Sequence, residues 1–322
     1  MFDALHEANA VKVEVAGKRV LVLIDPSKQL QLNTTEVALA CSPRGLGADA
    51  LVRCMYTEYV PGSTRLLELA PQAEWFIEAY SADASTLEVS GELLVATACA
   101  LVEQALVKAP IDFATRAGVR SVSKLDNVWS VAGQPINYAH PALAAQAGMD
   151  SAVNLQGTNY GALRLQVPQT LNVVAQGEID QSTQTFSGVG PWALLVSSQT
   201  TNYLTHIYTH LVPSQAQTPA AAPWPSQLAL AAGGAMYCWL SPQIAALADV
   251  SDSDDAKVDD AKVDAAKVTE AADAHATSAE PSDYLVKIGD HDLAVHLDGN
   301  PFTGERALIS MRANVVAQAM LF

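Results

Sequence analysis

The chain has 322 residues, of which 50% are hydrophobic and 16% charged, and its formal net charge at pH 7 is −16. This length suggests about two domains, and the apolar content is enough for sizeable cores. The acidic balance and the lack of a basic stripe argue against binding to nucleic acid, a polyanion that such a surface repels.

The ends and the apolar runs of the chain give no sign of export or membrane insertion. Residues 1–7 lack the charged and apolar regions of a signal peptide. The most apolar run, residues 92–106, is interrupted by polar side chains and falls short of the roughly 20 apolar residues of a membrane span. We therefore expect a cytoplasmic protein that does not contact membranes.

The cysteines are too scattered to form a recognisable metal site. They show neither a C-x-x-C motif nor the Cys/His spacing of zinc sites. Buried cysteines behave as small hydrophobic residues, so we expect this of all four: Cys41, Cys54, Cys99 and Cys238. The sequence predicts neither a metal nor a cofactor.

The first half of the chain reads as strands followed by one apolar helix. A helix start is predicted at residues 33–36, where Asn33 or Thr35 precedes an apolar run as the cap. A nearly all-apolar helix is predicted at about residues 91–107, after a turn of small residues. Alternating or apolar runs predict strands at residues 11–15, 19–24, 45–52, 66–69 and 74–80.

The second half repeats this order of elements. An apolar helix is predicted at residues 228–240. Strands are predicted at residues 162–167, 171–175, 193–197, 203–211, 291–297 and 307–310. A helix that is apolar on all sides must be covered all round. We therefore predict two similar α+β domains, residues 1–135 and 136–322, each with a buried central helix.

An acidic segment interrupts the second domain. Residues 254–268 contain a five-residue repeat of the type Asp-Asp-Ala-Lys-Val. The repeat offers too few apolar groups to offset the entropy that ordering would cost. Residues 250–283 are therefore predicted to be a disordered or transiently helical surface insertion; an acidic docking segment is the alternative.

Several short motifs resemble, in order and spacing, those of diaminopimelate epimerases. Residues 44–52 are similar to their Arg-x-x-Gly-x-Gly-x-Asp-Gln-Leu segment, and residues 80–85 look like their Phe-Asn-Ala-Asp-Gly-Ser. Residues 157–160 and 231–235 stand where the family has Gly-Asn-Pro-His and Cys-Gly-Ser-Gly-Ala. The resemblance implies that each domain is a curved, mostly antiparallel sheet wrapped around its central helix.

The chemistry that this resemblance implies needs two thiols that face each other across the substrate. The chain has Ser90 and Ala231 at the two places, so both catalytic cysteines are missing. A serine hydroxyl is far too weak an acid without a strong base, and alanine has no proton to give. We therefore expect a diverged member that does not use the two-thiol mechanism.

The same turn is also similar to that of phenazine-biosynthesis isomerase-like proteins, with Glu92 at the place of their histidine. Carboxylates that lose contact with water can titrate near neutral pH and shuttle protons. The predicted acid/base groups are Glu88, Glu92 and Asp83, with His210 as their partner from the second domain. Alternatively, Glu88 and Glu92 only stabilise the helix start or face solvent.

Candidate substrate-binding residues come from the same motifs. They are Ser81, Ser90, Gly91, Asn159, Gly233 and Gly234. The two glycines of the second helix have two interpretations: they permit close packing, or they form a backbone anion site at a helix start. His206 and His210 are four residues apart, but no third metal ligand is apparent.

Two functional hypotheses follow. The first is a cofactor-independent isomerase or epimerase that acts on a small carboxylate or amino acid between the domains. The second is a non-catalytic paralogue that keeps the scaffold for binding or assembly. We allow for a homodimer in both cases and expect neither nucleic acid nor membrane as a partner.

Overall fold

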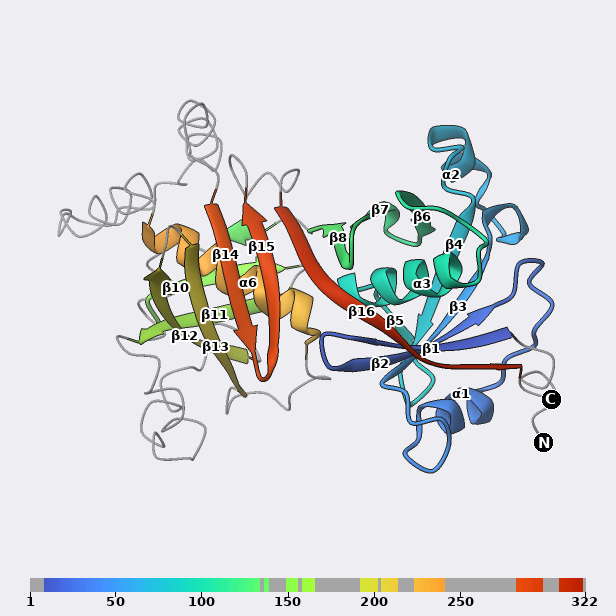
Figure 1. Cartoon of the computed structure of the whole chain (residues 1–322), viewed down its shortest axis with the longest axis horizontal. Coiled ribbons are helices and arrows are strands. Elements are labelled where there is room, and N and C mark those ends of the chain that lie inside the picture. Colours follow the sequence, from blue (N-terminus) through green and yellow to red (C-terminus); the bar gives the residue numbers. More distant parts are fainter. Residues whose placement is uncertain are drawn as a thin grey trace, which may run out of the picture. The chain divides into compact units, whose positions relative to one another are not determined.

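The computed structural model divides into two compact units, each described here by itself (Figure 1). Unit 1 comprises Met1–Ala132, Trp224–Ser226 and Ile309–Phe322; unit 2 comprises Gly133–Pro223 and Gln227–Leu308. The structure describes residues 9–133, 136–138, 149–155, 158–165, 192–201, 204–213, 223–240, 282–297 and 307–320. The acidic repeat therefore lies outside the described residues. No described helix is both long and apolar enough to span a membrane.

Unit 1 is built on a sheet that closes on itself. Its strands follow the order β1-β2-β3-β4-β6-β7-β8-β16, and β16 also pairs with β1. They are β1 (Asn9–Val15), β2 (Lys18–Ile24), β3 (Ala50–Tyr56), β4 (Trp75–Tyr80), β6 (Ile111–Thr115), β7 (Gly118–Leu125), β8 (Val128–Ala132) and β16 (Ala307–Met320). The short β5 (Thr86–Leu87) pairs with β4 beside this path.

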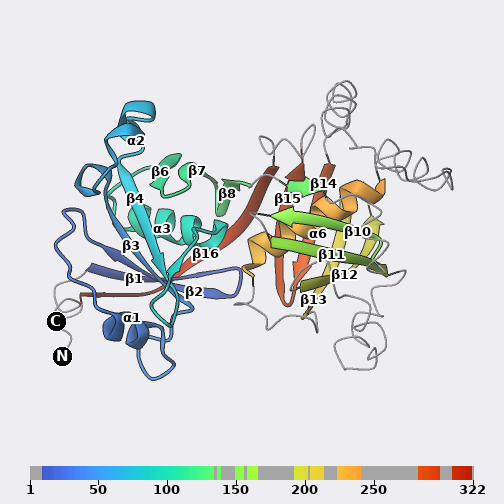
Figure 2. The same ribbon diagram turned by 180° about the vertical axis from the view of Figure 1, so that it is seen from behind.

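Helix α3 (Gly91–Glu103) is the central helix of unit 1. It packs against strands β1, β2, β3, β7 and β8 (Figures 1 and 2). All eleven residues from Gly91 to Leu101 are buried, including the charged Glu92. This burial explains why the sequence is apolar on every side of the helix: the sheet surrounds it.

Three smaller helices lie in the first half of unit 1: α1 (Thr34–Cys41), the short 3-10 helix η1 (Thr57–Tyr59) and α2 (Thr64–Leu69). Asn33 caps α1 by accepting from the Glu36 N–H at 3.0 Å, and Glu36 accepts from the Asn33 N–H at 3.1 Å. This reciprocal pair confirms the predicted helix start.

Unit 2 repeats this pattern of strands. Its described strands follow the order β15-β14-β13-β12-β11-β10-β9. They are β9 (Ile136–Tyr138), β10 (Ser151–Leu155), β11 (Thr158–Leu165), β12 (Trp192–Thr201), β13 (Leu204–Pro213), β14 (Ser282–Ile288) and β15 (His291–Leu297). In each unit a parallel pair flanks the long helix in the sequence: β4 with β6 in unit 1, and β13 with β14 in unit 2.

The helix of unit 2, α6 (Pro225–Leu240), is surrounded in the same way. A Cβ atom on Gly233 would lie 3.1 Å from Val295 of β15, and one on Gly234 would lie 3.0 Å from Ile136 of β9. Strands β15 and β9 are the two ends of the strand order of this unit. Both ends therefore reach adjacent residues of α6, so the sheet curves around the helix.

Most predicted elements within the described residues are present, whereas the predicted strand 171–175 lies outside them. Two predictions need correction. The strand predicted at 45–52 begins only at Ala50, because residues 43–46 form a turn. The segment 66–69 was predicted as a strand, but it forms part of helix α2, where Leu66 packs against Met55 and Phe76 while Leu69 is 75% exposed. The predicted α+β fold, with a curved sheet around a buried central helix in each of two similar units, is confirmed.

Candidate functional site

The turn that follows β4 holds Ser81 and Asp83, two of the predicted site residues. The Asp83 carboxylate accepts from the Ser85 N–H at 3.0 Å and from the Ser81 hydroxyl. Hydrogen bonds from Ser81 and Ser85 lower the pKa of Asp83 to about 2. The carboxylate thus stabilises its own turn and lacks the raised pKa that suits a proton shuttle at neutral pH.

Ser90 and Gly91 begin helix α3. Ser90 is the N-cap, and its buried hydroxyl accepts from the Leu93 N–H at 3.5 Å. A Cβ atom on Gly91 would lie 3.1 Å from the Cβ and Oγ atoms of Ser226 and 3.2 Å from Val131. Glycine at this position therefore allows another segment of unit 1, residues 224–226, to approach the start of α3 closely.

Glu92 binds that segment through both oxygens of its carboxylate. The backbone N–H of Ser226 donates to Oε1, and the Ser226 hydroxyl donates to Oε2 at 2.7 Å. Glu92 is 0% exposed and Ser226 is 2% exposed. The contact joins residues 134 positions apart in the sequence, and it lies within unit 1, between the first turn of α3 and the segment 224–226.

Burial raises the pKa of Glu92 above its ordinary value. Hydrogen bonds from Ser226, from Ser90 and from the backbone act in the opposite direction but do not cancel the loss of water. The surroundings of Glu92 thus raise its pKa, whereas those of Asp83 lower the pKa of that carboxyl group.

We expect the E92Q variant to change how stability depends on pH. The folded state binds the Glu92 proton more tightly than the unfolded chain, because its pKa is raised from 4.5. The stabilisation by this group is therefore complete below the ordinary pKa and is lost as the pH rises through the folded pKa. Glutamine cannot titrate, so the stability difference between wild type and E92Q should fall as the pH rises.

The measurement is urea unfolding at pH values from about 4.5, the ordinary value, upward, because the raised pKa places the ionisation of the native carboxyl group above that value. D83N is the control: the pKa of Asp83 is lowered, so its contribution is present above 3.8 and lost only as the pH falls towards 2. The difference between wild type and D83N should stay flat over this range. A flat curve for E92Q as well would contradict the raised pKa of Glu92.

Glu88 lies outside this buried contact. Its side chain is exposed, and its charge acts on Arg120 of β7. Burial lowers the pKa of Arg120, and the Glu88 carboxylate opposes that change. The guanidinium also donates to the carbonyl oxygen of Ala132 at 2.7 Å. Glu88 therefore has an electrostatic role at the surface of unit 1.

The remaining predicted residues belong to unit 2. Asn159 lies on β11, opposite Asn154 of β10, and His210 lies half-buried on β13, opposite Leu195. Gly233 and Gly234 were placed by one interpretation at a helix start. They instead lie in the interior of α6, which begins at Pro225, so their position requires a correction: they serve the close packing of the sheet on the helix.

Sequence reasoning missed Ser226, because the second apolar helix was predicted to begin only at residue 228. Proline is common at the first position of a helix, where its missing N–H is not needed. The Pro225-Ser226 pair was therefore a usable signal for the start of α6. What no local signal could show is that Ser226 contacts Glu92.

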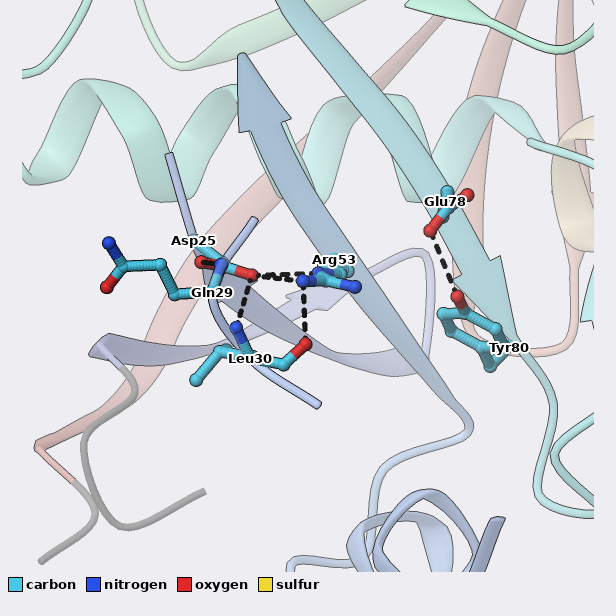
Figure 3. A network of polar contacts seen from close by, with 6 residues as sticks. All are labelled: Asp25, Gln29, Leu30, Arg53, Glu78 and Tyr80. Atoms are coloured by element: carbon cyan, nitrogen blue, oxygen red, sulfur yellow. Dashed lines mark hydrogen bonds and ion pairs between the residues drawn. The ribbon is translucent and has the colours of Figure 1, made fainter. Parts of the chain in front are cut away.

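Unit 1 contains a second buried polar cluster, outside the predicted site (Figure 3). The Arg53 side chain donates through Nε to Asp25 at 2.9 Å and through a terminal nitrogen to the carbonyl oxygen of Leu30 at 2.8 Å. Nearby on β4, the Tyr80 hydroxyl donates to Glu78 at 3.0 Å. Among the described residues, no group of three or more His, Cys, Asp or Glu side chains could hold a metal ion.

Part of the chain is similar in sequence to the diaminopimelate epimerase of Thermobifida fusca (strain YX). The two share 36% identity over 105 residues, which are 32% of this chain and 38% of that protein. The match thus spans well under half the length of this relative. No protein-family model matches the chain.

Solved structures share the fold over nearly the whole chain. A phenazine biosynthesis protein of the PhzF family from Bacillus anthracis has a TM-score of 0.54 at 12% identity, covering 97% of this chain and 98% of that one. A hydroxyproline epimerase from Agrobacterium vitis, with trans-4-hydroxy-L-proline bound, has a TM-score of 0.50 at 12% identity, with 97% and 91% covered. At these identities the similarity concerns the fold, and it confirms the predicted resemblance to diaminopimelate epimerase-like proteins.

Proposed function

We propose, from the premise that the chain has the diaminopimelate epimerase-like fold, that it is a cofactor-independent isomerase or epimerase in which Glu92 transfers the proton. Its substrate would be a small carboxylate or an amino acid. The observation that carries this proposal is a buried carboxyl group with a raised pKa at the N-terminus of the central helix of unit 1.

The chemistry needs a group that takes a proton from carbon and returns one to carbon. A carboxylate with an ordinary pKa is too weak a base at neutral pH, whereas a desolvated one accepts a proton more readily. The Glu92 carboxylate would remove the proton from a carbon next to the substrate's carboxyl group. The protonated Glu92 would then deliver it to another carbon on the same face of the substrate, which regenerates the carboxylate and completes an isomerisation. Epimerisation would in addition need an acid on the opposite face of the carbon that lost its proton.

The substrate class rests on the names of similar proteins. Diaminopimelate and hydroxyproline are both amino acids, and their epimerases are among the proteins that resemble this chain in sequence or in fold. Ser81 and Asn159 stay candidates for holding such a substrate, and His210 stays a candidate acid/base group.

Exchange of substrate hydrogen for solvent deuterium tests this function. Wild-type protein would be incubated in heavy water with a panel of small amino and hydroxy acids, and incorporation would be followed by proton NMR. We expect incorporation into at least one acid. E92Q should lower that rate by about 100-fold or more, the usual effect of losing a general base.

The control is E103Q, which removes a carboxylate at the far end of the same helix. The E103Q variant should exchange substrate hydrogen at the wild-type rate. Its free energy of unfolding shows how much the loss of one charge on α3 changes stability. Equal rates in wild type and E92Q would contradict proton transfer by Glu92.

One observation favours a second function, that of a non-catalytic binding or assembly module. Both oxygens of Glu92 are bonded to Ser226, and the side chain has no exposed surface. A carboxylate held in this way can serve only to hold the start of α3 against the segment 224–226. In that case the wild-type protein catalyses no exchange with any acid of the panel, and E92Q loses stability only.

A further inference from the structure

Ser226 offers Glu92 two donors of different kinds. Its backbone N–H belongs to the first turn of α6, where N–H groups have no acceptor within the helix. This N–H donates to Oε1 of Glu92, and the side-chain hydroxyl donates to Oε2 at 2.7 Å. A single residue thus binds both oxygens of the carboxylate.

The two donors differ in what they can do when Glu92 gains a proton. A backbone N–H can only donate, so an oxygen that faces it must accept and has little room for a proton of its own. A serine hydroxyl can donate or accept by rotating about its C–O bond. When Oε2 is protonated, the hydroxyl can turn and accept from it. The hydrogen bond at Oε2 therefore survives protonation.

The geometry around this pair is fixed by packing. Gly91 leaves room for Ser226, since a Cβ atom there would lie 3.1 Å from the Ser226 Oγ and Cβ atoms. Both Glu92 and Ser226 are buried, so water does not compete for the carboxylate oxygens. The groups that act on the Glu92 carboxyl are hydrogen-bond donors from Ser226, Ser90 and the backbone, and none of them is charged.

We propose that Ser226 is the positioning residue of Glu92: its N–H anchors Oε1, and its hydroxyl makes Oε2 the atom that takes up and releases the proton. The part that concerns turnover rests on the proposed function. The pairing of the hydroxyl with the titrating oxygen does not, and it can be tested by itself.

The test uses S226A in the full-length protein. The variant keeps the backbone N–H and loses the hydroxyl, so the charged form of Glu92 loses one donor. NMR titration of the Glu92 side-chain carboxyl carbon should show a pKa above that of the wild type. The deuterium exchange rate should fall about tenfold, the effect of one hydrogen bond to a charged group, and its pH profile should move upward.

Three further variants test whether a change in the Glu92 titration is due to the loss of the Ser226 hydroxyl. S226T keeps a hydroxyl and should restore the wild-type titration. S63A removes another buried serine hydroxyl of unit 1, one that donates to the carbonyl oxygen of Thr57, and should leave the Glu92 titration unchanged. If S226A does not fold, the same titration is carried out on S226C. A thiol is a weaker donor than a hydroxyl, so this variant should also have a raised Glu92 pKa.

The outcomes separate this inference from the proposed function. An unchanged Glu92 titration in folded S226A or S226C overturns the role of Ser226, whatever the exchange assay shows. A raised pKa in a protein whose wild type exchanges no substrate hydrogen keeps the pairing and overturns the proposed function. A raised pKa together with slower exchange at a shifted pH supports both.

Discussion

Replacing Asp25 with alanine should lower the free energy of unfolding by about 3–5 kcal/mol, the cost of breaking a buried ion pair. Asp25 is 5% exposed and its partner Arg53 is 7% exposed. The Asp25 carboxylate also accepts from the backbone N–H of Gln29 at 2.8 Å and of Leu30 at 3.1 Å (Figure 3). Alanine leaves the Arg53 charge buried without its partner and two N–H groups without an acceptor.

Urea unfolding measures this loss, and two comparisons define its cause. D25N combined with R53M removes both charges and keeps one side-chain oxygen, an acceptor for one of the two N–H groups, so it should recover part of the stability. R116A removes the exposed partner of Glu78, whose ion pair at 3.3 Å lies at the surface, and should cost about 0–1 kcal/mol. A D25A variant as stable as R116A would mean that the buried pair contributes nothing.

The next largest effect is expected for Gly45→Ala, in the loop between α1 and β3. A Cβ atom on Gly45 would lie 1.7 Å from the carbonyl oxygen of Leu39 and 2.8 Å from its carbon. These are backbone atoms of α1, so the last turn of that helix must move. We expect a loss of about 3 kcal/mol, the upper part of the range for overpacked sites.

Gly47→Ala is the matched control in the same loop. Gly47 has a φ of +60°, and a Cβ atom there would meet only the mobile ends of the Lys12 and Arg19 side chains, both at 3.9 Å. Its cost is torsional and should be about 1 kcal/mol. Thermal or urea unfolding of both variants compares a backbone clash with a strained dihedral angle. Equal losses would show that the approach of Gly45 to Leu39 is not a constraint.

Local sequence patterns were sufficient to predict those elements whose stabilising contacts lie within a few residues of each other. Asn33 and Glu36 cap each other within one turn, so the start of α1 could be predicted from four residues. The all-apolar composition of the central helix of each unit likewise predicted that a sheet would surround it. Helix α2 shows the limit: four residues with three leucines fit a strand or a short helix equally well.

The site needed information that no local pattern holds. Asp83 and Glu92 are both carboxylates near the same turn, yet hydrogen bonds lower the pKa of the first and burial raises that of the second. For Asp83 the donors are its neighbours Ser81 and Ser85, whereas the burial of Glu92 depends on chain segments far away in the sequence. Ser226 lies 134 residues after Glu92, and Arg53 lies 28 residues after Asp25. Such partners are brought together by the fold alone.

The pairing of β16 with β1 has a consequence for how the protein is made. The ribosome releases residues 9–132 long before residues 309–320, so the sheet around α3 first exists with one strand missing. Until β16 has been made, β1 and β8 present open edges, which can bind other extended chains. A fragment that ends near residue 132 would remain prone to aggregation unless β16 were supplied to it.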